Sequence, residues 1–503
     1  MDPLAFNTQT LIALFGLVGA VIVGGALLSG PTERTGLPAL AIFLLLGLLL
    51  GPYGLGLITV ALDDPLLRVV ATLSLTLVLF TDAMTLDLQE VRRNKALASL
   101  LLGPGTLLAA FGLAAVAWAL LGLPPIPAII LGTAVASTDP VVLRGMLQGS
   151  ALPERLRLAL RLESGMNDVL LLPIVVIALA YAAAGGVPEG GEVVRLLLSL
   201  FVLGPVAGVV VGVAAVRLLV WVRNRFGVRR EYEALYVIGV ALAAFAAAEA
   251  VGGSGFLAAF AAGLVVSSLD VELCDCFLEY GQVTAEMALL FTYVLLGTAP
   301  IWSGLGVLGP LSLLFAAIVL LFRLPIFAVA LRPLGLPMNE RLTLGWYGPR
   351  GLGSLLLALL AVFAGLPAGE QVVALTSLAV LVSVVLQGGW PLIQRRRRGR
   401  AGSRQDPLTT TPTSTTPLAE QPRNADSLML RPPTVPDRMT LEQLHLHESR
   451  GEPVVLIDVR TERSYRASET MAAGALRVPP EQAAAALKRN GVPTNAWVVA
   501  YCT

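Results

Sequence analysis

The chain has 503 residues, of which 56% are hydrophobic and only 14% are charged, and its mean hydropathy is +0.78. Soluble domains carry roughly 25% charged residues, so this composition excludes a cytosolic enzyme and indicates an integral membrane protein. The net charge of +1 gives no indication of a nucleic-acid partner, and no cofactor is expected. Both histidines, His445 and His447, lie in a polar tail, which excludes a histidine-based metal site inside the membrane.

About thirteen apolar stretches follow one another along the first four fifths of the chain. Each is close to the roughly 20 residues that a helix needs to cross the hydrocarbon core of a bilayer. We therefore expect residues 1–394 to form an all-α polytopic membrane domain. The predicted spans cover residues 10–29, 37–58, 66–86, 95–122, 126–147, 157–183, 193–222, 233–250, 253–268, 283–302, 306–331, 340–363 and 370–392.

Basic residues gather in alternate loops between these spans, and by the positive-inside rule such loops face the cytoplasm. The odd number of spans then predicts an N-terminus outside an inner cell membrane and a cytoplasmic C-terminus. The basic residues concerned are Arg34; Arg92, Arg93 and Lys95; Arg144, Arg155, Arg157 and Arg161; Arg223, Arg225, Arg229 and Arg230; Arg332 and Arg341; and Arg395 to Arg398.

A linker and a small soluble unit follow the predicted membrane domain. Residues 395–438 are basic at first and then rich in proline, threonine and serine, a composition typical of a disordered linker. Within residues 439–503, apolar runs at 453–460 and 496–502 alternate with helical patterns at 440–449 and 480–490. This alternation predicts the beginning of a parallel α/β layer.

The fifth span contains a proline beside a carboxylate. Pro140 has no N–H to give to the carbonyl four residues earlier, so the carbonyl of Ala136 loses its helical partner. Broken helices near the middle of the membrane commonly present backbone dipoles to an ion, and Asp139 lies at this break. The alternative is a simple proline kink in which a neighbouring helix satisfies Asp139.

The sixth span carries four polar residues on one broad helix face, Glu163, Ser164, Asn167 and Asp168. Glu163 and Asn167 are four positions apart, as are Ser164 and Asp168, while Ser164 and Asn167 are three apart. Carboxylate, hydroxyl and amide oxygens near one point suit a monovalent cation. Burial and a second nearby carboxylate both favour the protonated form of a carboxylic acid. One site can therefore hold either a proton or a cation, and this competition is sufficient for exchange. The sequence contains no ATP-binding G-x-x-x-x-G-K-[ST] motif.

Two arginines also fall within predicted spans, Arg323 and Arg350. A buried guanidinium needs a partner, and Glu163 is available. The alternative is that either arginine lies near a cytoplasmic end and extends to the surface. Gly348, Pro349 and Gly351 around Arg350 predict a second helix break, which would occupy the position corresponding to Pro140 if the two halves are inverted repeats.

Together these segments resemble the cation:proton antiporter superfamily, in particular sodium/proton exchangers of the NhaP and NHE types. The resemblance covers about residues 10–393. It rests on Ser137-Thr138-Asp139-Pro140, Glu163-Ser164-Gly165-Met166-Asn167-Asp168, the run from Glu249 to Ala258, and Gly348-Pro349-Arg350-Gly351.

The resemblance implies that Asp168 binds both the ion and the proton, assisted by Thr138, Asp139 and Ser164. It implies a Na⁺ site at these residues and, from the Asn167-Asp168 pair, electroneutral exchange.

The same resemblance makes Glu163 and Arg323 a structural ion pair. It further implies inverted repeats with crossed discontinuous helices, a homodimer, and a core domain that carries the ion in an elevator-like movement.

The tail resembles the first half of a rhodanese domain, on Leu456-Ile457-Asp458-Val459-Arg460, residues 473–479 and Val498 to Cys502. Cys502 matches the cysteine that carries sulfur in that family. The loop that would hold the sulfur follows this position, and the sequence ends at Thr503, so no sulfurtransferase activity is expected. We interpret the tail as a regulatory module.

The sequence thus predicts a secondary transporter that exchanges Na⁺ for H⁺ at Asp168, working with a monovalent cation, protons and membrane lipid. A K⁺/H⁺ exchanger is the alternative within the same class. A gated cation channel and a membrane-anchored sulfur-transfer enzyme are alternatives from other classes.

Overall fold

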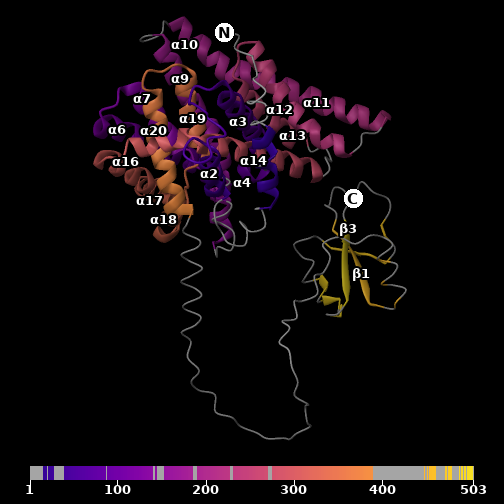
Figure 1. Cartoon of the computed structure of the whole chain (residues 1–503). Coiled ribbons are helices and arrows are strands. Elements are labelled where there is room, and N and C mark those ends of the chain that lie inside the picture. Colours follow the sequence, from indigo (N-terminus) through magenta and orange to yellow (C-terminus); the bar gives the residue numbers. More distant parts are fainter. Residues whose placement is uncertain are drawn as a thin grey trace, which may run out of the picture. The chain divides into compact units, whose positions relative to one another are not determined.

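The computed structural model describes residues 15–19, 21–27, 39–86, 88–139, 142–143, 152–184, 190–226, 230–269, 275–388 and parts of 444–501. Two compact units divide the chain, Met1–Pro407 and Leu408–Thr503, and the boundary falls within the predicted linker (Figure 1). The first unit is helical and the second contains a small sheet.

Helices occur within all thirteen predicted spans. Residues 15–19 and 21–27 are helical, and the first half continues with α2 (Ala39–Leu50), α3 (Pro65–Thr85), α4 (Leu88–Arg93), α5 (Lys95–Leu100), α6 (Leu108–Leu121), α7 (Pro125–Ala136), α9 (Glu154–Ala183), α10 (Gly190–Leu198) and α11 (Gly204–Phe226). The second half contains α12 (Arg230–Ala250), α13 (Gly255–Ser268), α14 (Asp275–Thr298), α15 (Ser303–Gly306), α16 (Pro310–Leu321), α17 (Arg323–Ala330), α18 (Met338–Trp346), α19 (Leu352–Phe363) and α20 (Gly369–Ser383).

Six helical segments among the described residues are long and apolar enough to cross a membrane, and a further pair does so with a 56° bend after Thr298. The remaining predicted spans contain shorter apolar helices, including α2, α7 and α19. The protein is therefore a multi-pass membrane protein in which several spans are interrupted.

The second predicted span, residues 37–58, is longer than the helix that forms there. Helix α2 ends at Leu50, and residues 51–64 form a loop. Gly51 lies against the backbone of Thr298, Pro52 has no N–H to continue the helix, and Gly56 has a φ of +64°. The predicted span was too long because it was based on hydrophobicity, which does not take account of the helix-breaking glycines and proline.

Helices α11 and α13 pack closely because small residues repeat every four positions on both. Gly204, Gly208 and Gly212 of α11 face the backbone of Ser254, Ala258 and Ala262, respectively. A Cβ atom at position 204 would lie 2.7 Å from the carbonyl oxygen of Ser254. Because lipid supplies no hydrophobic driving force between helices, such close backbone approach is a main source of packing energy in membranes.

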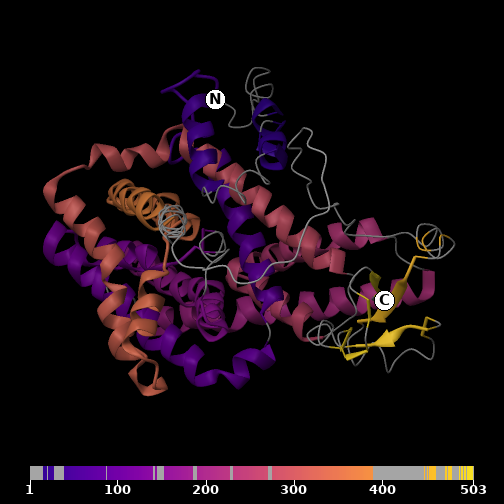
Figure 2. The ribbon, with the colours of Figure 1, turned by 90° about the horizontal axis from the view of Figure 1, so that it is seen from below.

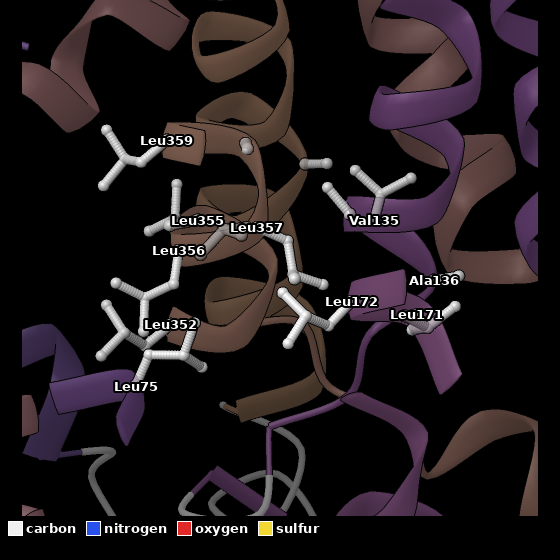
Figure 3. Close-up of a cluster of buried hydrophobic side chains, with 14 of the residues drawn as sticks. Leu75, Val135, Ala136, Leu171, Leu172, Leu352, Leu355, Leu356, Leu357 and Leu359 are labelled. Atoms are coloured by element: carbon white, nitrogen blue, oxygen red, sulfur yellow. The ribbon is translucent and has the colours of Figure 1, made fainter. Parts of the chain in front are cut away.

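The helices that hold the candidate site come from distant parts of the sequence. Helices α7, α19 and α20 contact one another, and α7 also packs against α6 and α9. Seen from below, the orange C-terminal helices of the membrane unit lie beside purple helices from its first third (Figure 2). Figure 3 shows part of the apolar cluster around these helices, in which Leu357 of α19 lies beside Leu172 of α9 and Leu352 lies beside Leu75 of α3.

The second unit confirms the predicted parallel layer. Strands β1 (Val454–Asp458) and β3 (Trp497–Tyr501) pair in parallel as the two apolar runs predict. A third strand that the sequence did not predict, β2 (Leu476–Arg477), pairs with the other edge of β1, giving the order β2-β1-β3.

One polar cluster stands beside this sheet. The Glu452 carboxylate contacts His447 at 2.8 Å and accepts a hydrogen bond of 2.7 Å from the Trp497 indole. These hydrogen bonds lower the pKa of Glu452 below its usual range. His447 thus pairs with a carboxylate, and no cluster of metal-binding side chains is found in the described part of the chain. His445 lies outside the described residues.

The contact between α11 and α13 can be tested by adding one methyl group. We expect Gly208→Ala to destabilise the protein by roughly 1–3 kcal/mol, because its Cβ would overlap the backbone of Ala258. The thermal unfolding midpoint of the purified chain in detergent measures this. Gly239→Ala on α12 is the matched control, since a Cβ there meets no atom within 4 Å. Equal midpoints for the two variants would contradict the packing argument.

Candidate functional site

Two interrupted helices meet inside the membrane unit. Helix α7 ends at Ala136 and the backbone of Ser137 to Asp139 is not helical, while residues 347–351 separate α18 from α19. The backbone N–H of Asp139 donates to the carbonyl of Pro349 at 2.9 Å. Both predicted breaks therefore exist and contact each other directly. Pro140, to which the first break was attributed, lies outside the described residues.

A positive side chain occupies the carboxyl end of α7. The Arg350 guanidinium donates to the carbonyl oxygens of Ala136 and, at 3.1 Å, Ser137, and it is only 1% exposed. The prediction that the freed Ala136 carbonyl faces a cation is thus met by an arginine of the protein rather than by an ion. A positive charge at this position interacts favourably with the negative end of the helix dipole. Arg350 does not extend to the surface.

The Asp139 carboxylate is held by both breaks. Its Oδ1 accepts from the backbone N–H of Val142 at 3.0 Å, while Oδ2 accepts 2.8 Å bonds from the Tyr293 hydroxyl and the Leu352 N–H. Since Leu352 is the first residue of α19, Asp139 caps that helix. Of the alternative reading from the sequence, the part in which neighbouring helices satisfy Asp139 agrees with these contacts, whereas the simple kink does not agree with the non-helical backbone at residues 137–139.

Asp168 has a different environment from Asp139. Its side chain is partly exposed, and Oδ1 accepts a 2.6 Å hydrogen bond from the Ser137 hydroxyl. Its Oδ2 lies against Gly353, where a Cβ atom would be 2.9 Å from this oxygen. Asp168 therefore accepts one hydrogen bond, from Ser137, and lies next to the meeting point of the two breaks as a partly exposed residue.

A chain of buried polar contacts runs behind Asp168. The Asn167 amide donates to the Thr138 hydroxyl at 2.6 Å, and Thr138 donates to Glu163 at 3.3 Å. Glu163 forms an ion pair of 3.0 Å with Arg323, and both side chains are almost fully buried. The predicted Glu163–Arg323 pair is therefore present. Thr138 and Asn167, which were expected to contact the ion, contact each other.

Ser164 lies on the same broad face of α9 as Asn167 and Asp168, but its hydroxyl makes a different contact. Its hydroxyl donates to the carbonyl of Arg161 at 3.4 Å, and its side chain lines a cavity of about 260 Å³. Asp82, Glu90 and Glu286 line the same cavity. Ser164 is thus placed beside an acidic cavity rather than in the hydrogen-bond network of Asp168.

Three residues of the site were not assigned from the sequence. Ser137 stands in a motif that was noted, but its bond to Asp168 depends on the turn after α7. Ser354 donates to the carbonyl of Ser137 at 3.2 Å, and Tyr293 reaches Asp139 from α14. Ser354 and Tyr293 are separated from their partners by more than 150 positions, and no local pattern could reveal such contacts. The remaining predicted site residue, Cys502, lies outside the described residues.

Comparison with known protein families identifies the family of this chain. Residues 17–391 match the family described as sodium/hydrogen exchanger, transmembrane. The chain belongs to this family. The family resemblance drawn from the motifs around Asp139, Asp168 and Arg350 is thereby confirmed, and the family consists of transporters rather than enzymes.

Individual relatives include both K⁺ and Na⁺ antiporters. The K(+)/H(+) antiporter NhaP of Alkalimonas amylolytica is 27% identical over 383 residues, which cover 75% of this chain and 65% of the relative. The Na(+)/H(+) antiporter NhaP of Pseudomonas aeruginosa is 28% identical over 363 residues, covering 66% of this chain and 82% of that protein. The chain thus spans slightly less than two thirds of the length of the K(+)/H(+) antiporter.

A solved structure shows the same fold. The sodium proton antiporter MjNhaP1 from Methanocaldococcus jannaschii, determined at pH 8, superimposes with a TM-score of 0.63 at 21% identity. The match covers 77% of this chain and 98% of the other. The helical membrane fold expected from the sequence is therefore confirmed, whereas the inverted-repeat relation between its halves stays a prediction.

The contribution of the Glu163–Arg323 ion pair to the stability of the protein can be tested by substitution. We expect Glu163→Gln to destabilise the protein by roughly 3–5 kcal/mol, because the Arg323 guanidinium would stay buried without its counter-charge. Thermal unfolding in detergent measures the effect, with Glu370→Gln at an exposed position of α20 as the control. The double variant Glu163→Gln/Arg323→Gln should lose less than the sum of both single losses. Additive losses would show that the two side chains do not depend on each other.

Proposed function

We propose that this protein exchanges a monovalent cation for protons across the membrane, and that Asp168 is the group at which the two compete. The observation that carries the proposal is the contrast between the carboxylates at the breaks. The Asp139 carboxylate accepts several hydrogen bonds and Glu163 forms an ion pair with Arg323, whereas Asp168 accepts one hydrogen bond, from Ser137, and is partly exposed.

Competition at one carboxylate is sufficient for coupled exchange. A neutral, protonated Asp168 and a cation-loaded Asp168 both avoid exposing a bare charge to a low-dielectric interior, whereas the empty ionised site does not. If only the two occupied forms cross readily, each cation that moves one way requires a proton to move the other way. The cation gradient then drives proton movement without nucleotide hydrolysis.

The charge arrangement favours electroneutral exchange. The neighbour of Asp168 is an amide, Asn167, which is bonded to Thr138 and brings no second charge to this position. One monovalent cation replacing one proton leaves the charge of the site unchanged. We propose Na⁺ as the cation because the family and the superimposed structure are named for sodium, and K⁺ is the alternative because several relatives are named as K⁺/H⁺ antiporters.

Further ligands would come from Thr138, Asp139 and Ser164, as the family resemblance implies. Thr138 is bonded to Asn167 and Glu163, and Asp139 accepts from Tyr293 and Leu352. Ion binding through either residue would therefore require these contacts to rearrange. We propose in addition a homodimer in the inner membrane, surrounded by lipid, with the N-terminus outside and the tail in the cytoplasm. The alternation of basic loops supports this orientation.

Exchange in proteoliposomes tests the proposal. With an imposed pH gradient, Na⁺, K⁺ or Li⁺ is added in turn, and the rate at which the gradient collapses is followed for the wild type and for Asp168→Asn. We expect exchange by the wild type, unaffected by a clamped membrane potential, and none by the variant. Glu370→Gln controls for loss of a carboxylate elsewhere.

Competition between the proton and the cation at Asp168 predicts how the exchange rate depends on pH below neutrality. Lowering the pH should raise the apparent KM for the cation, since protons occupy Asp168, while excess cation restores the maximal rate. Exchange that persists in Asp168→Asn would overturn the proposed site. A current through the wild type that survives this substitution would favour the cation channel.

A further inference from the structure

Two buried polar residues at the end of α20 form a hydrogen-bond chain that the ion site does not explain. The Ser383 hydroxyl donates to Oε1 of Gln387 at 2.7 Å, and both side chains are at most 1% exposed. Ser383 is the last residue of α20, and Gln387 lies in the π-helical turn Val384–Gly388 that follows. Buried polar side chains in a membrane helix are costly and usually serve a function, and π-helical turns often occur at functional sites.

The chain of hydrogen bonds holds the second break at two points. The Ser383 hydroxyl accepts a 2.8 Å bond from the backbone N–H of Arg350, and the Gln387 amide donates at 2.9 Å to the carbonyl of Trp346. Trp346 is the last residue of α18, while Arg350 lies within the non-helical segment 347–351. Backbone groups at membrane depth must find partners within the protein, and these two side chains satisfy one donor and one acceptor of the break.

From Arg350 the contacts continue to the proposed exchange site. Its guanidinium donates to the carbonyl oxygens of Ala136 and Ser137, and the hydroxyl of Ser137 donates to Asp168. The segment 347–351 also touches Asp139, since Pro349 accepts from the Asp139 N–H. A shift of segment 347–351 relative to α20 would therefore move Arg350. It would also move the backbone of Ala136 and Ser137, which positions the Ser137 hydroxyl next to Asp168.

We propose that Ser383 and Gln387 are positioning residues that fix the break between α18 and α19 and thereby hold Ser137 in the geometry in which Asp168 binds a cation. This inference rests on the proposed exchange at Asp168. Neither side chain contacts the ion site itself. They act through Arg350, and their removal should weaken cation binding more than it slows the transport of bound ions.

Kinetics of full-length variants in proteoliposomes test this role. Ser383→Ala leaves the Arg350 N–H without its acceptor, and Gln387→Met keeps the length of the side chain but removes its hydrogen-bonding groups. We expect each variant to raise the apparent KM for Na⁺ roughly threefold to tenfold, with a smaller change in the maximal rate. Because the two residues form one chain, the double variant should raise KM by less than the product of the single effects.

Matched variants separate positioning from general damage. Ser377→Ala removes another buried hydroxyl of α20, one that has no hydrogen-bond partner among the described residues, and should leave KM unchanged. Ser383→Thr retains a hydroxyl and should restore KM toward the wild-type value. Should Ser383→Ala fail to fold, as judged by its thermal unfolding midpoint, Gln387→Met carries the test on its own.

The outcomes are distinguishable from those of the proposed function. A wild type that does not exchange cations for protons overturns the proposed function and this inference with it. A wild type that exchanges through Asp168, while Ser383→Ala and Gln387→Met keep the wild-type KM, overturns the positioning role alone. A KM that rises equally in Ser377→Ala would also overturn it.

Discussion

Unpaired backbone groups inside a membrane are the constraint on which this structure depends. Where α7 ends and where α18 gives way to α19, N–H and C=O groups lose their helical partners at a depth without bulk water. The protein supplies those partners from the opposite break and from side chains. Asp139 bonds to the start of α19, and Arg350 bonds to the end of α7. Each break therefore supplies hydrogen-bond partners to the other.

The hydrogen bonds and the ion pair around the two breaks distinguish Asp168 from the other carboxylates, Asp139 and Glu163. Arg350 lies against backbone carbonyls, Arg323 pairs with Glu163, and Asp139 accepts from a hydroxyl and two N–H groups. Desolvated charges without such partners would cost several kcal/mol each. Asp168 differs because it is partly exposed and held through one oxygen. Compensated charges around one partly exposed carboxylate fit the proposed competition between a proton and a cation at Asp168.

Small residues make this frame possible on a larger scale. Gly132 of α7 lies against the backbone of Ala114 of α6, and Gly353 leaves room for the Asp168 carboxylate beside Ser137. The glycines of α11 do the same for the contact with α13. These glycines therefore permit close packing of helices and, at Gly353, close approach of the proposed exchange residue Asp168.

The sequence by itself determined the membrane class, the thirteen apolar segments and both helix breaks, and it singled out Asp139, Asp168, Glu163 and Arg350 as charged residues within predicted spans, because hydrophobic length and charge within an apolar segment are local properties. The predicted end of the second span, residue 58, lies beyond the end of α2 at Leu50, because mean hydropathy over a segment does not register single glycines and prolines. Only the tertiary structure decided the partners. Contacts such as Tyr293 with Asp139, Arg350 with Ala136, and Ser383 with Arg350 join helices whose order in space no local pattern encodes. Hydrogen bonds between distant segments are fixed by packing, so their partners are known only once the fold has formed.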